Sequence, residues 1–195
     1  MALLLNRSEV MKLLPMSKAI DVVEAAFGEL ASGTAEMPDR TVFIDPDVGG
    51  WIAYMPAYLK SGGALGIKAV TVYKENPSKF DLPTTVGTIL VQDNQTGEVV
   101  AVMDGGFLTA ARTGAVSGVA TRHLARKDAK IGGIFGTGVQ ARQQVVGMAA
   151  ARDLDTILAF SLDPDDARKE FADSLTTATG VDVRLTGSGE ELCRE

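Results

Sequence analysis

The stretch KIGGIFGTGVQARQQVV, residues 130–146, indicates a buried strand, a glycine-rich turn and the start of a helix. Its turn reads Gly136-x-Gly138-x-x-Ala141. Gly136 permits a sharp turn out of the strand, Gly138 lets a ligand approach the backbone, and Ala141 permits close packing of helix on strand. The helix N-terminus offers free N–H donors and a partial positive charge to an anion. Because the motif lies between a strand and a helix, it predicts a dinucleotide pyrophosphate site rather than merely a tight turn.

Strands and helices alternate through the rest of the C-terminal region. We expect strands at residues 131–135, 156–160 and 181–186. Between the second and the third, the run Asp163-Pro164-Asp165-Asp166 predicts a helix start, because it combines a cap, a proline at the first helical position and acids in the first turn. Such alternation is typical of parallel strands joined by crossover helices. We therefore expect a Rossmann-type parallel sheet here.

The last residues indicate that this sheet is incomplete. Ser188 and Glu191 match a capping box, which predicts a helix, yet the chain stops at Glu195 after barely one turn. A complete doubly wound sheet has about six strands, roughly three more than this region offers. The sequence is therefore expected to be a fragment, or a truncated product, of a longer protein.

The N-terminal region shows a different pattern. Ser8 and Ser17 resemble helix N-caps, and apolar residues then recur every three or four positions as far as Gly33. Segments rich in β-branched and aromatic residues follow, and they predict strands at residues 40–44, 50–58, 64–73, 85–93 and 98–104. A helix crowded with small residues comes next, at 107–124, where small side chains permit close packing or a functional role.

These patterns define a fold class and two domains. We expect an α/β protein whose residues 1–125 form a sheet-rich α+β domain, mostly antiparallel and closed by the helix at 107–124. The charged run RKDAK, residues 126–130, opens the second domain, an incomplete Rossmann-type NAD(P)-binding domain at 126–195.

Composition narrows the function class. The 195 residues carry a formal net charge of −6, which argues against nucleic acid as the main partner. Cys193 is the only cysteine, so no internal disulfide forms, and the lack of a signal sequence also favours the cytoplasm. No apolar run approaches the roughly 18 residues of a membrane span. No metal site is expected, because His123 is the only histidine and fits a solvated helix end.

Three cations stand out in this acidic chain. Lys68 lies among apolar residues in ALGIKAVTVY, where a lysine needs an anion or loses its proton, unless it extends to solvent from near the strand end. Arg112 lies in the small-residue helix and suits a carboxylate or a pyrophosphate, although a structural salt bridge would also explain it. Arg40 opens the first of the five strands and fits either a binding role or the surface.

The choice of dinucleotide depends on the end of the strand at 156–160, which continues as AFSLDP. NAD sites usually place an acid there for the ribose hydroxyls, and NADP sites have an arginine nearby. Ser161 occupies the place of the acid. Asp163 lies two residues late, and a helix cap is enough to explain it. The sequence favours NAD slightly and leaves NADP open.

Several segments together resemble the ornithine cyclodeaminase/μ-crystallin family: MPDR, YMPAYL, LGIK, LPTTVGTILVQDNQTGEVVAVMDGGFLTAARTGAVSGVATRHLA and IFGTGVQA. The resemblance spans residues 8–183 and is most specific over 82–124. It implies a substrate and dimerisation domain joined to a Rossmann domain, usually in a homodimer. It also implies an NAD- or NADP-dependent enzyme acting on small amino, imino or keto acids.

The resemblance also implies roles for single residues. The cations that match the substrate-carboxylate and catalytic positions are Arg40, Lys68 and Arg112, with Lys68 as the catalytic residue. The positions that match dinucleotide contacts are Thr84, Arg112, Val139 and Gln140, which join Gly136 and Gly138 of the glycine-rich turn. Ser161 falls where many NAD-using members carry the ribose-binding aspartate.

Two departures from the family pattern bear on activity. Ornithine cyclodeaminases carry a glutamate just before the Met-Pro that recognises the far amino group of ornithine, and Ala53 stands at that place. A smaller or less cationic substrate is therefore expected. The family's catalytic aspartate lies in the latter half of the nucleotide domain, beyond residue 195, so the chain by itself is expected to be inactive or poorly folded.

The resemblance therefore predicts NAD(P)-dependent hydride transfer on a small amino or imino acid, as in alanine dehydrogenases or imine reductases. A cyclodeaminating lyase, which uses the same hydride twice, is the close alternative. Two further alternatives are a crystallin-like NAD(P)-binding protein without major turnover and a non-functional truncated product.

Overall fold

The computed structural model describes residues 1–194, which group into two compact units. Unit 1 comprises Met1–Leu14 and Ala25–Thr109, and unit 2 comprises Pro15–Glu24 and the chain from Ala110 onward. Helices α2 (Met16–Ser32) and α4 (Gly105–Leu124) each contribute residues to both units. The predicted boundary between residues 125 and 126 stays a prediction. Within residues 1–194, no helix is both long enough and apolar enough to cross a membrane.

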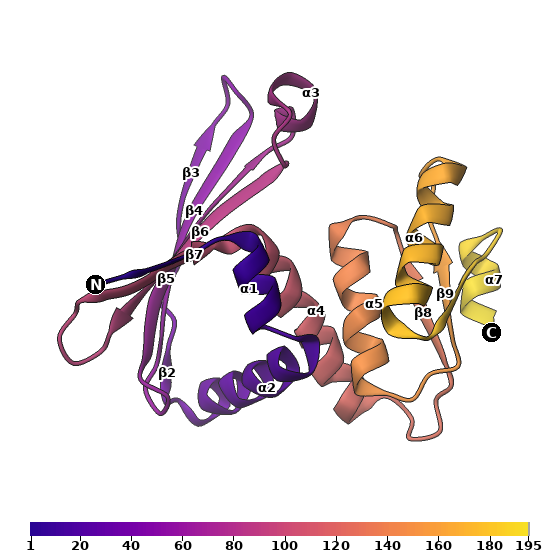
Figure 1. The fold of residues 1–195 in the computed structure, drawn as a ribbon, viewed down its shortest axis with the longest axis horizontal. Coiled ribbons are helices and arrows are strands. Elements are labelled where there is room, and N and C mark those ends of the chain that lie inside the picture. Colours follow the sequence, from indigo (N-terminus) through magenta and orange to yellow (C-terminus); the bar gives the residue numbers. More distant parts are fainter. Residues whose placement is uncertain (195) are drawn as a thin grey trace. The chain divides into compact units, whose positions relative to one another are not determined.

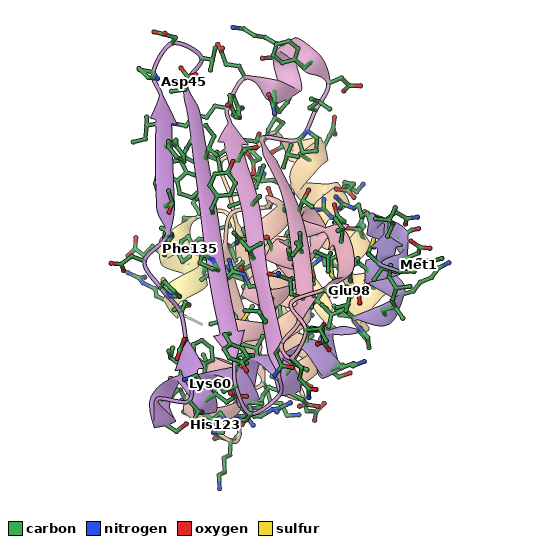
Figure 2. All side chains as sticks on the ribbon, turned by 90° about the vertical axis from the view of Figure 1, so that its left-hand side faces the viewer. Met1, Asp45, Lys60, Glu98, His123 and Phe135 are labelled. Carbon is green, nitrogen blue, oxygen red and sulfur yellow. The ribbon has the colours of Figure 1, made fainter. Side chains whose placement is uncertain are left out.

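Unit 1 is built on one seven-stranded sheet (Figure 1). Its strands are β1 (Leu3–Leu5), β2 (Ala35–Glu36), β3 (Thr41–Asp45), β4 (Gly50–Leu59), β5 (Ala64–Tyr73), β6 (Thr85–Asp93) and β7 (Val99–Asp104). The order is β1-β7-β6-β5-β4-β2, and β3 also pairs with β4. All neighbours are antiparallel except β1 and β7, so the prediction of a mostly antiparallel sheet is confirmed. Asp45 and Lys60 lie at opposite ends of this sheet (Figure 2).

The strands predicted at 64–73 and 85–93 match β5 and β6, and the other three agree to within one residue at each end. Three short elements of unit 1 were not predicted: β1, β2 and helix α3 (Asn76–Phe80). They span at most five residues each, too few to establish a period. Helix α3 begins with Asn-Pro, and this proline lies in the first helical turn, where its missing N–H costs no hydrogen bond.

The first helix cap also differs from the prediction. Helix α1 (Arg7–Leu13) is capped by Asn6 and not by Ser8. The Asn6 side chain accepts a hydrogen bond from the Glu9 N–H at 3.1 Å, and the Glu9 carboxylate accepts one from the Asn6 N–H at 2.8 Å. This reciprocal pair is a capping box, which satisfies two backbone donors at once. Similarly α2 begins at Met16, so Ser17 lies inside its first turn.

Unit 2 contains a three-stranded parallel sheet in the order β10-β9-β8. The strands are β8 (Ile131–Phe135), β9 (Thr156–Phe160) and β10 (Asp182–Leu185), and the helices that follow them are α5 (Val139–Ala151), α6 (Asp165–Thr179) and α7 (Gly189–Arg194). The predicted alternation and the strands at 131–135 and 156–160 are confirmed, while the third strand is shorter by one residue at each end.

Helices cover both faces of this parallel sheet (Figure 1). Side-chain atoms of Met148 on α5 lie within 4 Å of a Cβ placed at Gly132, while Leu192 of α7 lies next to Gly133. Because successive residues of a strand face opposite ways, α5 and α7 pack on opposite faces of β8. The core between the sheet and α5 and α6 includes fully buried side chains from each layer: Val145, Ile157, Ala159 and Phe171.

The small residues of α4 allow a very close contact with α5 inside unit 2. A Cβ placed on Gly114 would lie 2.2 Å from the carbonyl oxygen of Gln143, and one placed on Gly147 would lie 2.2 Å from the carbonyl oxygen of Gly114. Both neighbours are backbone atoms, which cannot move aside as a flexible side chain can. The two helices therefore require glycine at both positions.

Charged side chains join the ends of the same helices. The Arg152 guanidinium donates to the carbonyl groups of Thr121, Arg122 and Ala125 at 2.8–3.2 Å, which satisfies acceptors at the C-terminus of α4. Arg122 in turn donates to Asp21 at 2.9 Å and to Glu24 at 2.5 Å, which connects α4 to the part of α2 that belongs to unit 2. His123 lies 2.5 Å from the second carboxylate oxygen of Glu24.

We predict that Gly147→Ala lowers the stability of unit 2 by at least about 2 kcal/mol, because overpacking against backbone outweighs the better helix propensity of alanine. The matched control is Gly28→Ala, in the interior of α2, where a Cβ meets nothing within 4 Å. This control should be stabilising by about 0.4–1 kcal/mol. Thermal unfolding followed by circular dichroism measures both, and equal effects in the two variants would contradict the close contact.

Candidate functional site

The glycine-rich turn joins β8 to α5 in unit 2. Gly136 has φ of +90°, a left-handed conformation that favours glycine, and its N–H donates to the carbonyl of Phe160 on β9 at 2.7 Å. Gly138 is the N-cap residue of α5, and no side chain makes a capping hydrogen bond there. The first N–H groups of α5 are therefore not occupied by a side-chain cap, which is the condition for binding an anion.

Space around the turn is also open. A Cβ placed on Gly136 or Gly138 would meet no atom within 4 Å. Val139 is 65% exposed and Gln140 is exposed as well, whereas Ala141 is buried against the sheet. The turn thus combines a bare backbone, uncapped donors and open space at its two glycines. These features fit the pyrophosphate of a dinucleotide, so the residues of the predicted motif lie together as expected for such a site.

A second feature of the site is a group of three polar side chains, Thr137, Ser161 and Asp163, which we call the hydroxyl–carboxylate cluster. Ser161 donates to Asp163 Oδ2 at 2.6 Å, and Thr137, in the middle of the glycine turn, donates to the same oxygen. The Asp163 N–H donates to Ser161 Oγ at 3.0 Å, and the two hydroxyl oxygens lie 3.3 Å apart. The cluster therefore ties the end of β9 to the turn after β8.

The cluster has a defined charge. Hydrogen bonds from Ser161 and then from Thr137 lower the pKa of Asp163 from 3.8, with partial burial opposing them and the positive charge of Arg168 adding to them. Asp163 is thus an anion at neutral pH. Thr137 and Ser161 are only 9% and 8% exposed, and buried hydroxyls require partners. Asp163 supplies the acceptor for both.

Two members of the cluster were not predicted as site residues: Asp163 was interpreted as a helix cap, and Thr137 was assigned no role. Asp163 was predicted to cap the helix, but the N-cap residue is Pro164 and α6 begins at Asp165. The distance of Asp163 from the strand does not by itself indicate that the chain turns back. The short spacing of Ser161 and Asp163, with a side-chain to backbone bond across two residues, is the local signal that could have revealed it.

Lys68 lies in the middle of the sheet of unit 1. It pairs with Met55 on β4 and with Ile89 on β6, and it is partly buried. Directly paired residues share a face of the sheet, so apolar side chains flank Lys68 on both neighbouring strands. Val70, two residues along β5 on the same face, is 5% exposed. Lys68 is therefore a central strand residue, and the alternative of a lysine near the strand end does not describe it.

Two other predicted positions fall near Lys68 in this sheet. Arg40 is exposed and directly precedes Thr41, which pairs with Tyr54 on β4. Because β3 and β4 are antiparallel, Arg40 lies within one residue of the level of Met55. Ala53 is completely buried and pairs with Val70, so it lies on the same face as Lys68. Ala53 stands where an ornithine cyclodeaminase would carry a glutamate. A small apolar side chain therefore occupies this position, on the same face of the sheet as Lys68.

The remaining predicted residues lie elsewhere. The Thr84 carbonyl accepts a hydrogen bond from the Tyr73 N–H at 2.9 Å. Thr84 lies five residues before Ile89, the partner of Lys68, and so about 17 Å along the strand from the level of Lys68. Arg112 is exposed on the part of α4 that belongs to unit 2. Convergence of the three cations, and of Thr84, on one nucleotide and one substrate stays a prediction.

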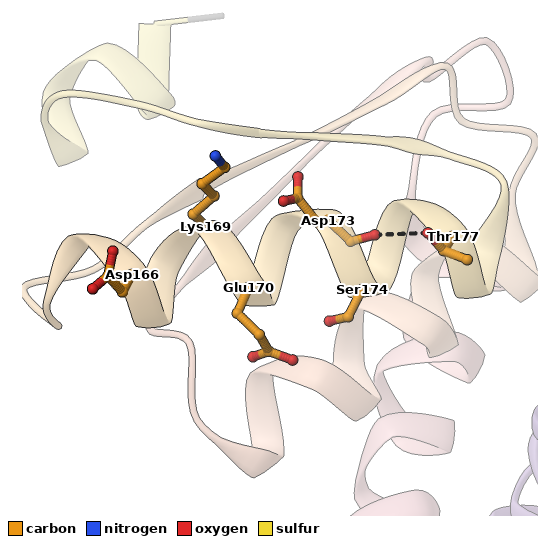
Figure 3. Close-up of a pocket in the computed structure, with 6 residues that line it drawn as sticks. All are labelled: Asp166, Lys169, Glu170, Asp173, Ser174 and Thr177. Carbon is orange, nitrogen blue, oxygen red and sulfur yellow. Dashed lines mark hydrogen bonds between the residues drawn. The ribbon is translucent and has the colours of Figure 1, made fainter.

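Other polar features do not coincide with the glycine turn. A groove of about 670 Å³ follows α6, where Thr177 donates to the carbonyl of Asp173 at 3.0 Å (Figure 3). Its lining comes from α6 alone: Asp166, Lys169, Glu170, Asp173, Ser174 and Thr177. Across residues 1–194, no group of three or more His, Cys, Asp or Glu side chains could hold a metal ion. Cys193 is exposed.

Comparison with known proteins identifies close relatives. The model of the ornithine cyclodeaminase/mu-crystallin family matches residues 1–195. A Delta(1)-pyrroline-2-carboxylate reductase of Bacillus cereus is 36% identical over 193 residues, which cover 99% of this chain and 59% of that protein.

Solved structures of two related enzymes are also similar to this chain. The Delta(1)-pyrroline-2-carboxylate reductase of Thermococcus litoralis, in complex with NADH and L-proline, is 44% identical with a TM-score of 0.91, covering 97% of this chain and 58% of that one. An archaeal alanine dehydrogenase dimer with bound NAD is 33% identical with a TM-score of 0.87, covering 97% and 57%. The chain therefore spans less than two thirds of each of these relatives.

We predict that Ser161→Ala raises the pKa of Asp163, because it removes the hydrogen bond that lowers the pKa most. A folded-state pKa below the unfolded value contributes stability that is present above pH 3.8 and is lost as the pH falls through the folded value. Carboxyl ¹³C NMR titration measures the midpoint. Thr137→Ser, which keeps its hydroxyl, is the matched control and should leave the midpoint unchanged. An identical midpoint in Ser161→Ala would contradict the cluster.

Proposed function

Because the chain belongs to the ornithine cyclodeaminase/mu-crystallin family, we propose that the whole protein transfers a hydride between a nicotinamide dinucleotide, preferably NAD, and a small amino or imino acid. The observation that carries this proposal is the bare, uncapped glycine turn at the N-terminus of α5. It would hold the pyrophosphate through the N–H groups of Gly138, Val139 and Gln140. The relatives bound to NADH and to NAD support the same choice of cofactor.

The substrate we propose is a cyclic imine with a 2-carboxylate, of the kind that gives L-proline on reduction. The Thermococcus relative, 44% identical, is a reductase of this class in complex with L-proline. The face of the sheet around Lys68 agrees with such a substrate, because Ala53 and Met55 are apolar and offer no acceptor for a second amino group. An ornithine-type diamino acid would leave its terminal ammonium without a partner at Ala53, which disfavours the cyclodeaminase alternative.

The chain's own residues would supply binding and charge. Arg40 and Arg112 would hold the substrate carboxylate, since guanidinium groups pair with carboxylates through two parallel hydrogen bonds. Lys68 would stabilise charge at the reacting imine and deliver a proton to its nitrogen. The nicotinamide, when bound, supplies the hydride to the imine carbon. The predicted contacts of Thr84, Arg112 and Ser161 with the dinucleotide belong to this proposal.

We propose in addition that the whole protein is a cytoplasmic homodimer assembled through unit 1. The archaeal alanine dehydrogenase relative is a dimer. In unit 1, Phe43 and Ile44 of β3 are 56% and 74% exposed, and such apolar exposure is typical of a surface that another chain covers. The cytoplasm is the expected location because a nicotinamide-dependent reductase works where that cofactor is available.

The proposal is tested by assaying the product of the complete reading frame with NADH and Δ1-pyrroline-2-carboxylate. We expect oxidation of NADH and formation of proline. In a parallel reaction, ornithine with NAD should give neither proline nor ammonia. Proline plus ammonia without net NADH would favour a lyase. Nucleotide binding without turnover of any amino, imino or keto acid would favour a binding protein.

In that assay, Lys68→Met should lower kcat/KM by about 100-fold or more, because it removes a positive charge from the reacting centre. Lys12→Met, at an exposed position in the last turn of α1, removes the same charge elsewhere in unit 1 and should have no effect. Steady-state kinetics with the imine as the varied substrate measures both. Equal activity of the two variants would show that Lys68 has no catalytic role.

A second prediction concerns the glycine turn. Gly138→Ala adds a methyl group where no protein atom lies within 4 Å, at a residue with an ordinary φ of −76°, so the fold should keep its thermal midpoint. The methyl group would occupy the space of the pyrophosphate, so the Kd for NADH should rise at least tenfold, as measured by fluorescence titration. Gly62→Ala, which also meets nothing within 4 Å, is the control. Unchanged NADH affinity in Gly138→Ala would place the nucleotide elsewhere.

A further inference from the structure

We infer that Asp163 is the residue that makes the site select NAD(H) over NADP(H), by accepting hydrogen bonds from the adenosine ribose hydroxyls through its free carboxylate oxygen. This inference rests on the proposed function, because it presupposes that the glycine turn binds a nicotinamide dinucleotide. It transfers to Asp163 the ribose-binding role predicted for Ser161.

The position of Asp163 is the first argument. An acid that binds the ribose is expected directly after the second strand, where Ser161 stands. The Asp163 N–H donates to Ser161 Oγ at 3.0 Å, which folds the chain back so that the carboxylate reaches both Ser161 and Thr137. The acid is two residues late in sequence but lies beside the glycine turn in space. Ser161 is buried and holds the acid, and Asp163 is exposed to a ligand.

The hydrogen bonds of the cluster leave half of the carboxylate available. Ser161 and Thr137 both donate to Oδ2 of Asp163. Within residues 1–194, Oδ1 accepts no hydrogen bond, so its lone pairs can accept from a neighbouring pair of ribose hydroxyls. Two hydroxyl donors on the other oxygen fix the orientation of the group before the ligand arrives, which reduces the ordering cost of binding.

The negative charge of Asp163 would discriminate between NAD(H) and NADP(H). NADP(H) differs from NAD(H) by a phosphate on the adenosine ribose, and this phosphate would lie against an ionised carboxylate. Arg168, the cation whose charge acts on Asp163, is already paired with Asp165 on α6, and its side chain is 24% exposed. It is therefore poorly placed to compensate a second anion. The cluster should accept the free diol and reject its phosphorylated form.

The test measures the Kd of NADH and of NADPH by nucleotide fluorescence on the product of the complete reading frame. In Asp163→Asn, the preference for NADH over NADPH should fall at least tenfold. Asp163→Ser, which keeps a hydroxyl acceptor for Thr137 and Ser161, should give the same result if the amide variant does not fold. Asp166→Asn, in the first turn of α6, removes the same charge and should leave the preference unchanged.

The outcomes are distinguishable. If Asp163 only shapes the turn, both nucleotides lose affinity equally and the ratio is unchanged, which overturns the inference while the proposed function stands. A wild-type protein that prefers NADPH also overturns it. A wild-type protein that binds neither nucleotide overturns the proposed function, and this inference with it.

Discussion

A backbone without side chains at Gly136 and Gly138 is the constraint on which the site in unit 2 depends. The left-handed φ of Gly136 lets its N–H bond to β9 while the chain leaves β8, so the turn stays close to the sheet. No side chain caps α5, and a Cβ placed on Gly136 or Gly138 would meet no atom within 4 Å. A helix end that carried its own capping side chain would satisfy those donors internally and leave less for an anion.

The packing of unit 2 supports this turn from behind. Helix α5 follows its N-cap residue Gly138, and Gly114 and Gly147 allow the body of this helix to touch α4 backbone to backbone. On the other side, Val145 is fully buried in the core shared with α6. The helix that presents the donors is thus fixed by close contacts on two sides, and a fixed dipole binds an anion without a reorganisation cost.

The sequence predicted elements with a clear period better than contacts that depend on long-range geometry. β5 and β6 were predicted to the residue because ten and nine residues of strand pattern lie between clear turns. β1 was missed because three leucines carry no period, and it becomes a strand only by pairing with β7, far along the chain. Asp163 was interpreted as a helix cap because its distance from the strand in sequence does not predict the turn that brings it to Thr137. The glycine motif was identified because its chemistry is local.

The claim that the glycine-rich turn between β8 and α5 binds a dinucleotide is tested most directly by amide hydrogen exchange, measured on the whole protein with and without NADH. Exchange should slow at least tenfold at Gly138, Val139 and Gln140, whose N–H groups carry no side-chain cap in the free structure. Amides of the sheet in unit 1 away from the ligand should be unchanged. NADH binding detected by fluorescence, with unaltered exchange at those three amides, would contradict the account.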